Sequence, residues 1–420
     1  MSLALKQTYE RELSFDEVVA KYPEVPRLII VKIDVQRRGV HYTDTALSVV
    51  DPKIHLVRDT GTRELFGGRA QEKKSLPISL LLRDGTSVIT SPTPLEQNPY
   101  LVDLVNGRLA LVDNDEVIEY VELWRRPRYY DLKTSSGIPM SHVLSARPQR
   151  LSLTLSNYCH FWTKNQGCLY CDSNRDSKQL KKEIGIPRVK PQDISETVRE
   201  ALKEPGRFST FCITSGSILA GNELFDKEVD TYIEALQAIG ENFKTKKFPS
   251  QMVATAFNEK QLQRLYDETG IMSYTSDLEV LNEERFSWIC PGKAENVGYQ
   301  GWKQRVIRAL DIFGRGNVSS GFVGGVELAK PYGFIREDEA LRSTLEEAES
   351  LAESGVPAFF VVWVPRAGSP FHDQQSPSLD YFVQLASGLH QLRVKYGLTV
   401  DFDDYRRCGN HPDTDLSRLL

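Results

Sequence analysis

The sequence contains no long hydrophobic run and few cysteines. Its longest continuous apolar stretch is about eight residues, around Phe359 to Val364, whereas a membrane-spanning helix needs ~20. The six cysteines are scattered along 420 residues, unlike the dense pattern of a disulfide framework. Residues 1–14 show no signal-peptide pattern, and the chain has no internal repeat. These absences argue against a membrane span and a disulfide scaffold, and they predict a cytoplasmic protein.

An excess of basic residues is also missing. The chain has 52 Lys and Arg against 57 Asp and Glu, for a net charge of −5. This balance argues against a nucleic-acid-binding surface and favours a small-molecule partner. With 40% hydrophobic and 26% charged residues, the composition is that of a globular protein, and the length allows two domains.

Three of the six cysteines lie in one stretch, between Leu151 and Asn174. The stretch begins with alternating apolar and polar residues, which is typical of a strand. Cys159, Cys168 and Cys171 follow with the spacing C-x8-C-x2-C. Iron–sulfur clusters are normally held by four thiolates, so a cluster held by three would leave one iron open to a small molecule. The alternative is a closed, structural zinc site in which His160 completes a Cys₃His set.

From residue 150 onward, strand-like and helix-like segments alternate. This order predicts a parallel sheet with right-handed crossovers. Six repeats are too few for a complete eight-fold barrel. We therefore expect an α/β fold, a partial (β/α)6 TIM-like barrel over residues 150–395. The expected strands are 151–157, 208–214, 251–256, 272–280, 318–323 and 358–364, and the expected helices are 195–203, 227–239, 259–268, 301–313, 338–354 and 381–396.

The residues before this barrel have a different pattern. A helical piece is expected near 14–21, and β-branched residues predict a strand over 28–35. Further strand-like runs are separated by hairpin turns at Asp84-Gly85, at Asn106-Gly107 and around Asn114. We expect a small β-rich domain over 1–125, a connector over 126–149, and a C-terminal tail over 396–420 that carries Cys408.

Polar residues and glycines collect where the barrel strands are expected to end, which is where parallel α/β folds place their chemistry. Ser215, Gly216 and Ser217 form a small turn that a ligand could approach closely. Asp277 and Glu279 share one face of a strand end, a costly arrangement unless they bind a cationic or polar group. Arg366 could pair with a carboxylate. Lys293 could contact a substrate, although a lysine in a loop is usually solvated.

The cysteine loop resembles that of the radical S-adenosylmethionine (radical SAM) superfamily, in which three cysteines hold a [4Fe-4S] cluster and SAM chelates the fourth iron. Cys168-Leu169-Tyr170-Cys171 has the aromatic residue that the superfamily places before its last cysteine. The spacer of eight residues between Cys159 and Cys168 exceeds the usual three. Gly324-x-x-Glu327 resembles part of a signature that follows strand five, and residues 365–370 resemble a segment of biotin-synthase-like members.

The resemblance implies a radical SAM enzyme. Cys159, Cys168 and Cys171 would bind the cluster, and an electron donor would reduce it. Reductive cleavage of SAM would then start radical chemistry on a small-molecule substrate. The SAM site or its support would include Tyr170, Ser215, Gly216, Ser217, Asp277, Glu279, Gly324 and Glu327. Two alternatives remain open: transfer of a 3-amino-3-carboxypropyl group from SAM to an arsenic or other small acceptor, and a zinc-stabilised binding protein without catalysis.

Overall fold

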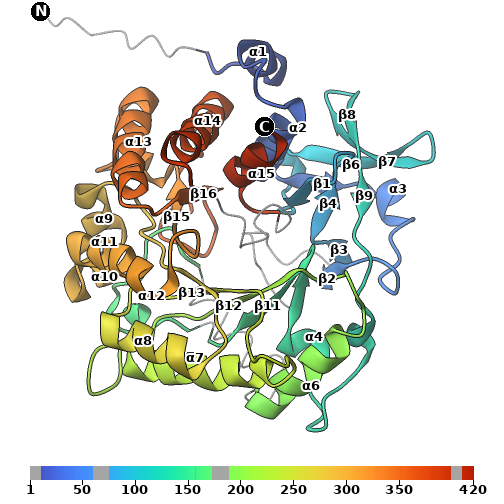
Figure 1. The fold of residues 1–420 in the computed structure, drawn as a ribbon. Helices are drawn as coiled ribbons and strands as arrows, with labels where there is room; N and C mark the ends of the chain where they lie inside the picture. The colour runs from blue at the N-terminus through green and yellow to red at the C-terminus, as the bar shows by residue number, and fades with distance from the viewer. Residues whose placement is uncertain (1–10, 60–74, 157, 173–188, 399–408) are drawn as a thin grey trace, which may run out of the picture.

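The computed structural model describes residues 11–59, 75–156, 158–172, 189–398 and 409–420. Figure 1 shows a mixed α/β molecule whose largest sheet curls into a half-barrel with helices outside it. A second group of short sheets lies beside the open edge of the half-barrel. In the described part of the chain, no helix has the length and apolar character required to cross a membrane.

The half-barrel sheet has seven strands in the order of the sequence. Its first pair is antiparallel and every later pair is parallel, so the six strands expected from the sequence are present and adjacent. The first strand, β10, comes from the segment expected to be a connector; three residues are too few to show a periodic pattern. The strands are β10 (Ser145–Arg147), β11 (Arg150–Thr154), β12 (Thr210–Thr214), β13 (Ser250–Val253), β14 (Ser273–Thr275), β15 (Val318–Gly324) and β16 (Ala358–Val362).

Helices connect the parallel strands and cover the outside of the sheet (Figure 1). The predicted helix over 259–268 is confirmed residue for residue. Asn258 and Gln261 form a reciprocal capping box, which fixes the start of this helix. The helices are α6 (Pro191–Ala201), α7 (Asp226–Gly240), α8 (Glu259–Glu268), α9 (Glu283–Ile289), α10 (Pro291–Asn296), α11 (Tyr299–Arg308), α12 (Leu310–Phe313), α13 (Glu337–Glu353) and α14 (Leu379–Tyr396).

Strand β14 is shorter than the predicted strand over 272–280. Beyond Thr275, side chains replace part of the backbone ladder to β15. The carboxylate of Asp277 accepts the Gly321 N–H at 2.9 Å, and the hydroxyl of Ser320 accepts the Leu278 N–H at 3.2 Å. The chain therefore still runs alongside β15, but it leaves regular strand geometry where the polar residues begin.

The N-terminal part is built from three small sheets, and the three predicted turns are confirmed as hairpin connections. Asn106 and Gly107 both have positive φ, as do Asn114 and Asp115. The strands are β1 (Val40–Tyr42), β6 (Tyr100–Val105), β7 (Arg108–Asp113) and β8 (Glu116–Tyr120) in one sheet, β5 (Ser87–Ile89), β4 (Ser79–Leu81) and β9 (Glu122–Leu123) in another, and β2 (Val57–Asp59) with β3 (Ser75–Pro77) in the third. The remaining short elements are α1 (Phe15–Lys21), α3 (Asp44–Leu47), α4 (Met140–Val143), η1 (Leu95–Gln97), η2 (Arg128–Asp131), η3 (His160–Lys164), η4 (Val326–Leu328) and α15 (Pro412–Leu419).

The predicted strand over 28–35 is wrong, because this segment is helix α2 (Arg27–Arg38). Every residue from Leu28 to Val35 is buried. Ile29 and Ile33 belong to the barrel's hydrophobic core, whereas Val31 and Val35 pack in the core of the N-terminal sheets. A helix buried on both sides loses the 3.6-residue pattern of apolar residues, so β-branched composition was misleading here.

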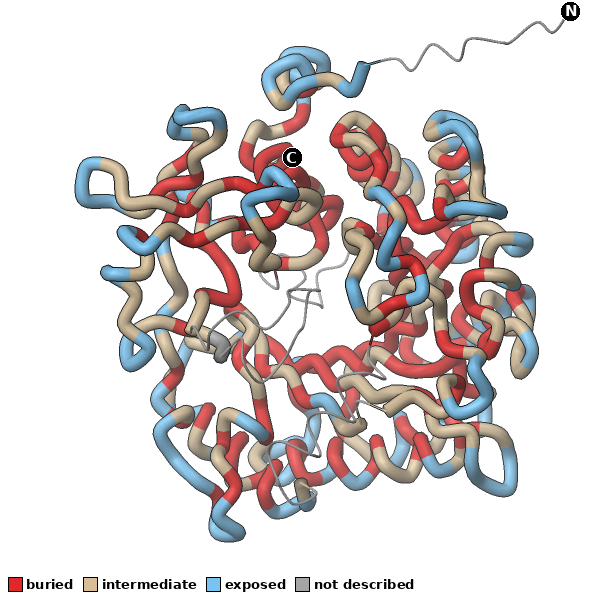
Figure 2. The backbone as a smooth tube through the Cα atoms, turned by 180° about the vertical axis from the view of Figure 1, so that it is seen from behind, coloured by how far each residue is buried: buried red, intermediate tan, exposed pale blue. Residues whose placement is uncertain are grey.

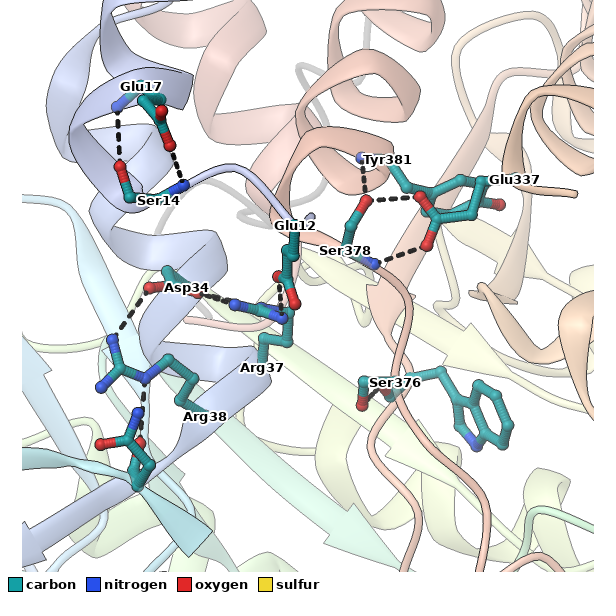
Figure 3. A network of polar contacts seen from close by, with 12 residues as sticks. Glu12, Ser14, Glu17, Asp34, Arg37, Arg38, Glu337, Ser376, Ser378 and Tyr381 are labelled. Carbon is teal, nitrogen blue, oxygen red and sulfur yellow. Dashed lines mark hydrogen bonds and ion pairs between the residues drawn. The ribbon is translucent and has the colours of Figure 1, made fainter. Parts of the chain in front are cut away.

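Polar contacts hold α2 in place. Asp34 accepts hydrogen bonds from Arg37 at 2.9 Å and from the hydroxyl of Tyr100 at 2.7 Å, and Figure 3 shows it between Arg37 and Arg38. Lys32, fully buried, forms an ion pair with Asp415 of α15. Most residues of both helices are buried, and Figure 2 shows that the buried segments lie in the interior of the molecule.

The part of the predicted C-terminal tail that the structure describes at its end, residues 409–420, packs against the barrel. Phe360 of the last strand, β16, has its N–H bonded to the carboxylate of Asp413 and its carbonyl bonded to the ring of His411. Arg393 of α14 bonds the Ala358 carbonyl at 2.8 Å and pairs with Asp413. Side chains therefore satisfy the open edge of the sheet, which would otherwise expose unpaired backbone groups.

Candidate active site

The cysteine loop begins directly after β11 and lies against the turn that follows β12. The His160 N–H bonds the Ser217 carbonyl at 2.8 Å, and the Gly216 N–H bonds the Ser156 carbonyl at 2.7 Å. A side chain at Gly216 would come within 2.5 Å of the Tyr158 carbonyl oxygen, so only glycine allows this approach. The structure thus brings the predicted Ser215–Ser217 turn to the first cysteine, Cys159.

The second half of the loop is held from two other directions. The Leu169 N–H bonds the Ile289 carbonyl at 2.9 Å, and the Gly292 N–H bonds the Gln166 carbonyl at 3.0 Å. On the other side, the Phe371 N–H bonds the Leu169 carbonyl at 3.2 Å. These partners follow β14 and β16, so segments after three different strands fix the cysteine loop across the carboxyl ends of the sheet.

The predicted pairing of Arg366 with a carboxylate is confirmed. Its guanidinium lies 3.4 Å from Asp172, the residue after Cys171. Asp172 is buried, and Arg366 is more than one-third exposed. The pair therefore ties the end of the cysteine loop to the loop after β16.

The three thiols lie at one end of the barrel and are half-buried. Cys159 and Cys168 interact electrostatically, and the Cys171 N–H bonds the Cys168 carbonyl at 3.0 Å. Burial raises the pKa of the Cys159 thiol. A hydrogen bond from Cys290 lowers the pKa of Cys168, which also accepts one from the hydroxyl of Tyr170.

The donor set fits an iron–sulfur cluster. Three thiols on one anchored loop are one ligand short of the usual four, and neighbouring hydroxyl and thiol groups can donate to their sulfurs. Within the described ranges, no three His, Cys, Asp or Glu side chains are already arranged as a metal-binding group. The fit therefore depends on the donor chemistry and on the anchoring of the loop.

Lys293 is buried, and the expectation of a solvated loop lysine is wrong. Its ammonium group donates to the Glu279 carboxylate at 2.7 Å and to the Asp277 carbonyl at 2.8 Å. It also lies 4.3 Å from the centre of the Trp302 ring. Burial alone would lower the pKa of Lys293, but Glu279 and the thiol of Cys168 raise it above its usual value. The cationic group that the sequence led us to expect beside Asp277 and Glu279 is therefore the ammonium group of Lys293, a residue of the same chain.

Asp277 and Glu279 lie close enough to interact, as predicted. Burial, with the charge of Glu279 adding to it, raises the pKa of Asp277 to about 6. Glu279 has a φ of 68°, a left-handed conformation that costs a non-glycine residue about 1 kcal/mol or more. Its backbone nevertheless bridges to Phe322 of β15. This strained residue turns its side chain toward Lys293.

Two residues that the sequence did not single out lie near these groups. His411 lies close enough to Asp277 to influence its charge, and its ring packs on Phe359 at 4.6 Å between centroids. Glu228 of α7 is fully buried and accepts hydrogen bonds from the Ile218 N–H at 2.8 Å and the Thr255 hydroxyl at 3.0 Å. Burial raises the pKa of Glu228 to about 7. Neither residue belongs to a recognisable motif; only their contacts reveal them.

Glu327 and Gly324 face the outer helices. Glu327 is bonded by the hydroxyl of Tyr381 and by the Gly325 N–H at 2.9 Å. Burial raises the pKa of Glu327. A side chain at Gly324 would meet Phe360 and Leu385 within 3 Å. These contacts give both residues a role in shaping the turn after β15.

Some of the expected residues lie outside the described ranges. Cys408 falls in 399–408, and the end of the first expected strand falls at residue 157. Residues 173–188, which follow the cysteine loop, are likewise not described.

Comparison with known proteins gives one curated relative and several solved structures. No protein-family model matches the chain. The chain is 21% identical over 358 residues to bacteriochlorophyllide c C-7(1)-hydroxylase of Chlorobaculum limnaeum, a match that covers 75% of this chain and 83% of that enzyme.

The solved structures are more distant. A radical SAM methyltransferase from Sphaerobacter thermophilus matches at 12% identity with a TM-score of 0.41, over 96% of this chain and 98% of that one. Methylornithine synthase (PylB) matches at 16% identity with a TM-score of 0.39, over 62% of this chain and 72% of that one. The cobalamin-dependent S-adenosylmethionine radical enzyme OxsB matches at 13% identity with a TM-score of 0.32, over 64% of this chain and 40% of that one.

Proposed function

We propose that the chain binds a [4Fe-4S] cluster through Cys159, Cys168 and Cys171 and cleaves S-adenosylmethionine reductively to start radical chemistry on a small molecule. The observation that carries this proposal is the position of the cysteine loop. Segments following β12, β14 and β16 hold it by backbone hydrogen bonds at the carboxyl ends of the strands, where α/β folds place their active sites.

The residues around the loop have distinct tasks in this proposal. When bound, the reduced cluster supplies the electron that breaks a C–S bond of SAM. Gly216 and Ser217 keep the Cys159 end of the loop in place through the backbone contacts given above. Lys293 orients Glu279 and neutralises its charge, so that Asp277 and Glu279 remain close together in a buried position. These carboxylates, with Tyr170 and Ser215, are our candidates for contacts to SAM.

The substrate class is inferred from the charge of the chain and from the curated relative. The net negative charge and the absence of basic runs favour a small molecule over nucleic acid. The curated relative is named for hydroxylation at a carbon of a bacteriochlorophyllide. We include in the proposal an external electron donor and a reaction that begins at a carbon atom of the substrate.

Anaerobic reconstitution with iron and sulfide tests this function. We expect about four irons per chain and, after reduction with SAM, 5′-deoxyadenosine as the nucleoside product. The triple variant with Cys159, Cys168 and Cys171 changed to serine should bind no cluster, whereas Cys212→Ser should bind it normally. Methylthioadenosine as the product would instead indicate transfer of the aminocarboxypropyl group. Bound zinc with SAM left intact would refute both enzyme functions.

A further inference from the structure

A fourth thiol lies beside the cysteine loop although it belongs to a distant part of the sequence. Cys290 stands at the junction between α9 and α10 and is fully buried. The residues on either side of it are bonded to the loop: the Ile289 carbonyl accepts the Leu169 N–H, and the Gly292 N–H donates to the Gln166 carbonyl. These two bonds align Cys290 with Cys168, which lies between Gln166 and Leu169.

The junction has little freedom to move away, because the loop packs closely against Gly292. A Cβ atom at Gly292 would lie 2.5 Å from the ring of Phe161 and 2.6 Å from the Gln166 carbonyl oxygen. The backbone of the junction and the backbone of the loop are therefore in direct contact, and this packing fixes the distance between the two segments. The side chain of Cys290 can change its rotamer, but its backbone is held against the cysteine loop.

The thiol of Cys290 lies next to the sulfur of Cys168, within reach of a hydrogen bond. Tyr170 supplies a second donor to the same sulfur, and the Lys293 cation acts on both thiols. The sulfur of Cys168 thus has a thiol, a hydroxyl and a cation close to it. A thiol placed in this way is suited to hydrogen-bond a cluster ligand without being a ligand itself.

We propose that Cys290 is a positioning residue that hydrogen-bonds the Cys168 sulfur and stabilises the reduced form of the cluster. This inference rests on the proposed function, because it assigns Cys168 as a ligand. A hydrogen bond to a ligand sulfur withdraws electron density, and reduction adds negative charge, so the bond favours the reduced state. Its loss should lower the midpoint potential.

The proximity of the Cys168 and Cys290 thiols is tested first in the cluster-free protein, so that the result does not depend on the proposed function. In the double variant Cys159→Ser, Cys171→Ser, diamide should oxidise the thiols of Cys168 and Cys290 to one disulfide. Diamide takes up the two electrons and two protons and becomes the hydrazine. Peptide mass mapping should find this pair, and adding Cys290→Ser should abolish it. Absence of the Cys168–Cys290 disulfide would overturn the inference.

The effect on the cluster is then measured by a redox titration followed by electron paramagnetic resonance. Cys290→Ala should lower the ratio of reduced to oxidised cluster at a fixed potential about tenfold, which is about 59 mV for a one-electron couple. Cys290→Ser keeps a donor and should restore most of the ratio, whereas Cys212→Ala, another buried thiol, should leave it unchanged. Equal ratios in wild type and Cys290→Ala, at full iron content, would refute the inference. Zinc in place of iron would refute the proposed function, while the disulfide would still form.

Discussion

Two buried lysine–carboxylate pairs serve different parts of this molecule. Lys32 and Asp415 join α2 to α15, and both side chains are completely buried. Lys293 and Glu279 meet beside the cysteine loop, and both side chains keep a small exposed fraction, 10% and 17%. The first pair lies between helices that cover the open edge of the sheet, and the second lies between a strained residue and a thiol-rich loop.

The difference shows how the same chemistry can be used for structure or for a site. Around Lys32, the neighbouring residues of α2 are apolar and packed in two cores. Around Lys293, the neighbours are Glu279, Cys168 and Cys290, which are all able to carry charge or take part in reactions. We therefore expect changes at the first pair to affect stability, and changes at the second to affect activity more than stability.

The largest effect is expected when Asp415 is changed to leucine. This leaves Lys32 buried without its carboxylate, which typically costs about 3–5 kcal/mol of the free energy of unfolding. The double variant Lys32→Met, Asp415→Leu should recover most of that loss, because an apolar pair of similar volume replaces the ion pair. Urea denaturation followed by circular dichroism measures both. A loss below about 1 kcal/mol in the single variant would contradict a structural role for this pair.

Glu228 is a buried carboxyl that interacts with backbone and hydroxyl donors, and it should give a pH-dependent effect. Its pKa is raised from 4.5 to about 7 in the folded chain, so the folded state binds more protons than the unfolded state between these values. Stability from this group is then fully present below pH 4.5 and is lost as the pH rises through 7. The loss amounts to roughly 3 kcal/mol, from 1.36 kcal/mol per pKa unit.

Glu228→Gln removes this titration. Between pH 4.5 and 7, the free energy of unfolding of wild type should fall relative to that of the variant, and the difference should level off at higher pH. Denaturation curves collected at several pH values measure the two slopes. Parallel slopes would show that Glu228 titrates normally in the folded chain.

Much of the barrel could be predicted because each strand and helix carries its own local pattern. The segment over 259–268 shows apolar spacing and caps that suffice to place α8. By contrast, α2 is apolar on both sides, because it separates two cores, and its sequence resembles a strand. The helix at 412–419 is short. From the sequence alone, Asp413 and Asp415 would be expected on the surface, because their buried partners lie in distant segments.

The site was predictable where a motif lies within one loop and unpredictable where partners come from distant segments. The three cysteines and Tyr170 share a single stretch, so their spacing alone made them candidates. Nothing local indicates that Cys290 reaches Cys168, or that Lys293 holds Glu279, because these contacts depend on how α9 and α10 pack against the loop.

Lys293→Met tests the active-site side of the comparison. The variant keeps the length of the side chain but removes the cation that holds Glu279, and we expect SAM cleavage to fall about 100-fold, as displaced catalytic groups commonly cause. Lys303→Met is the matched control, because Lys303 pairs with Glu347 at the same 2.7 Å on the outer helices α11 and α13. Equal losses of cleavage in both variants would show that Lys293 has no special relation to the site.

The double variant Lys293→Met, Glu279→Gln sharpens the same point. Removing both charges should restore most of the stability that Lys293→Met loses, since the Glu279 carboxylate is no longer left without its cation. SAM cleavage should stay low, because neither the carboxylate nor its cation is present. Recovery of cleavage together with stability would mean that the pair is structural, like Lys32 and Asp415.

The smallest effect is expected at Arg366, whose partner Asp172 ends the cysteine loop. Half-exposed ion pairs contribute about 1 kcal/mol or less, and this one has a long separation of 3.4 Å with Arg366 37% exposed. Arg366→Ala should therefore change the free energy of unfolding by less than about 1 kcal/mol, and the KM for SAM by less than about threefold. A larger rise in KM with unchanged stability would show that Arg366 contacts the ligand directly, and it would extend the active site from the Lys293 side of the loop to the loop after β16.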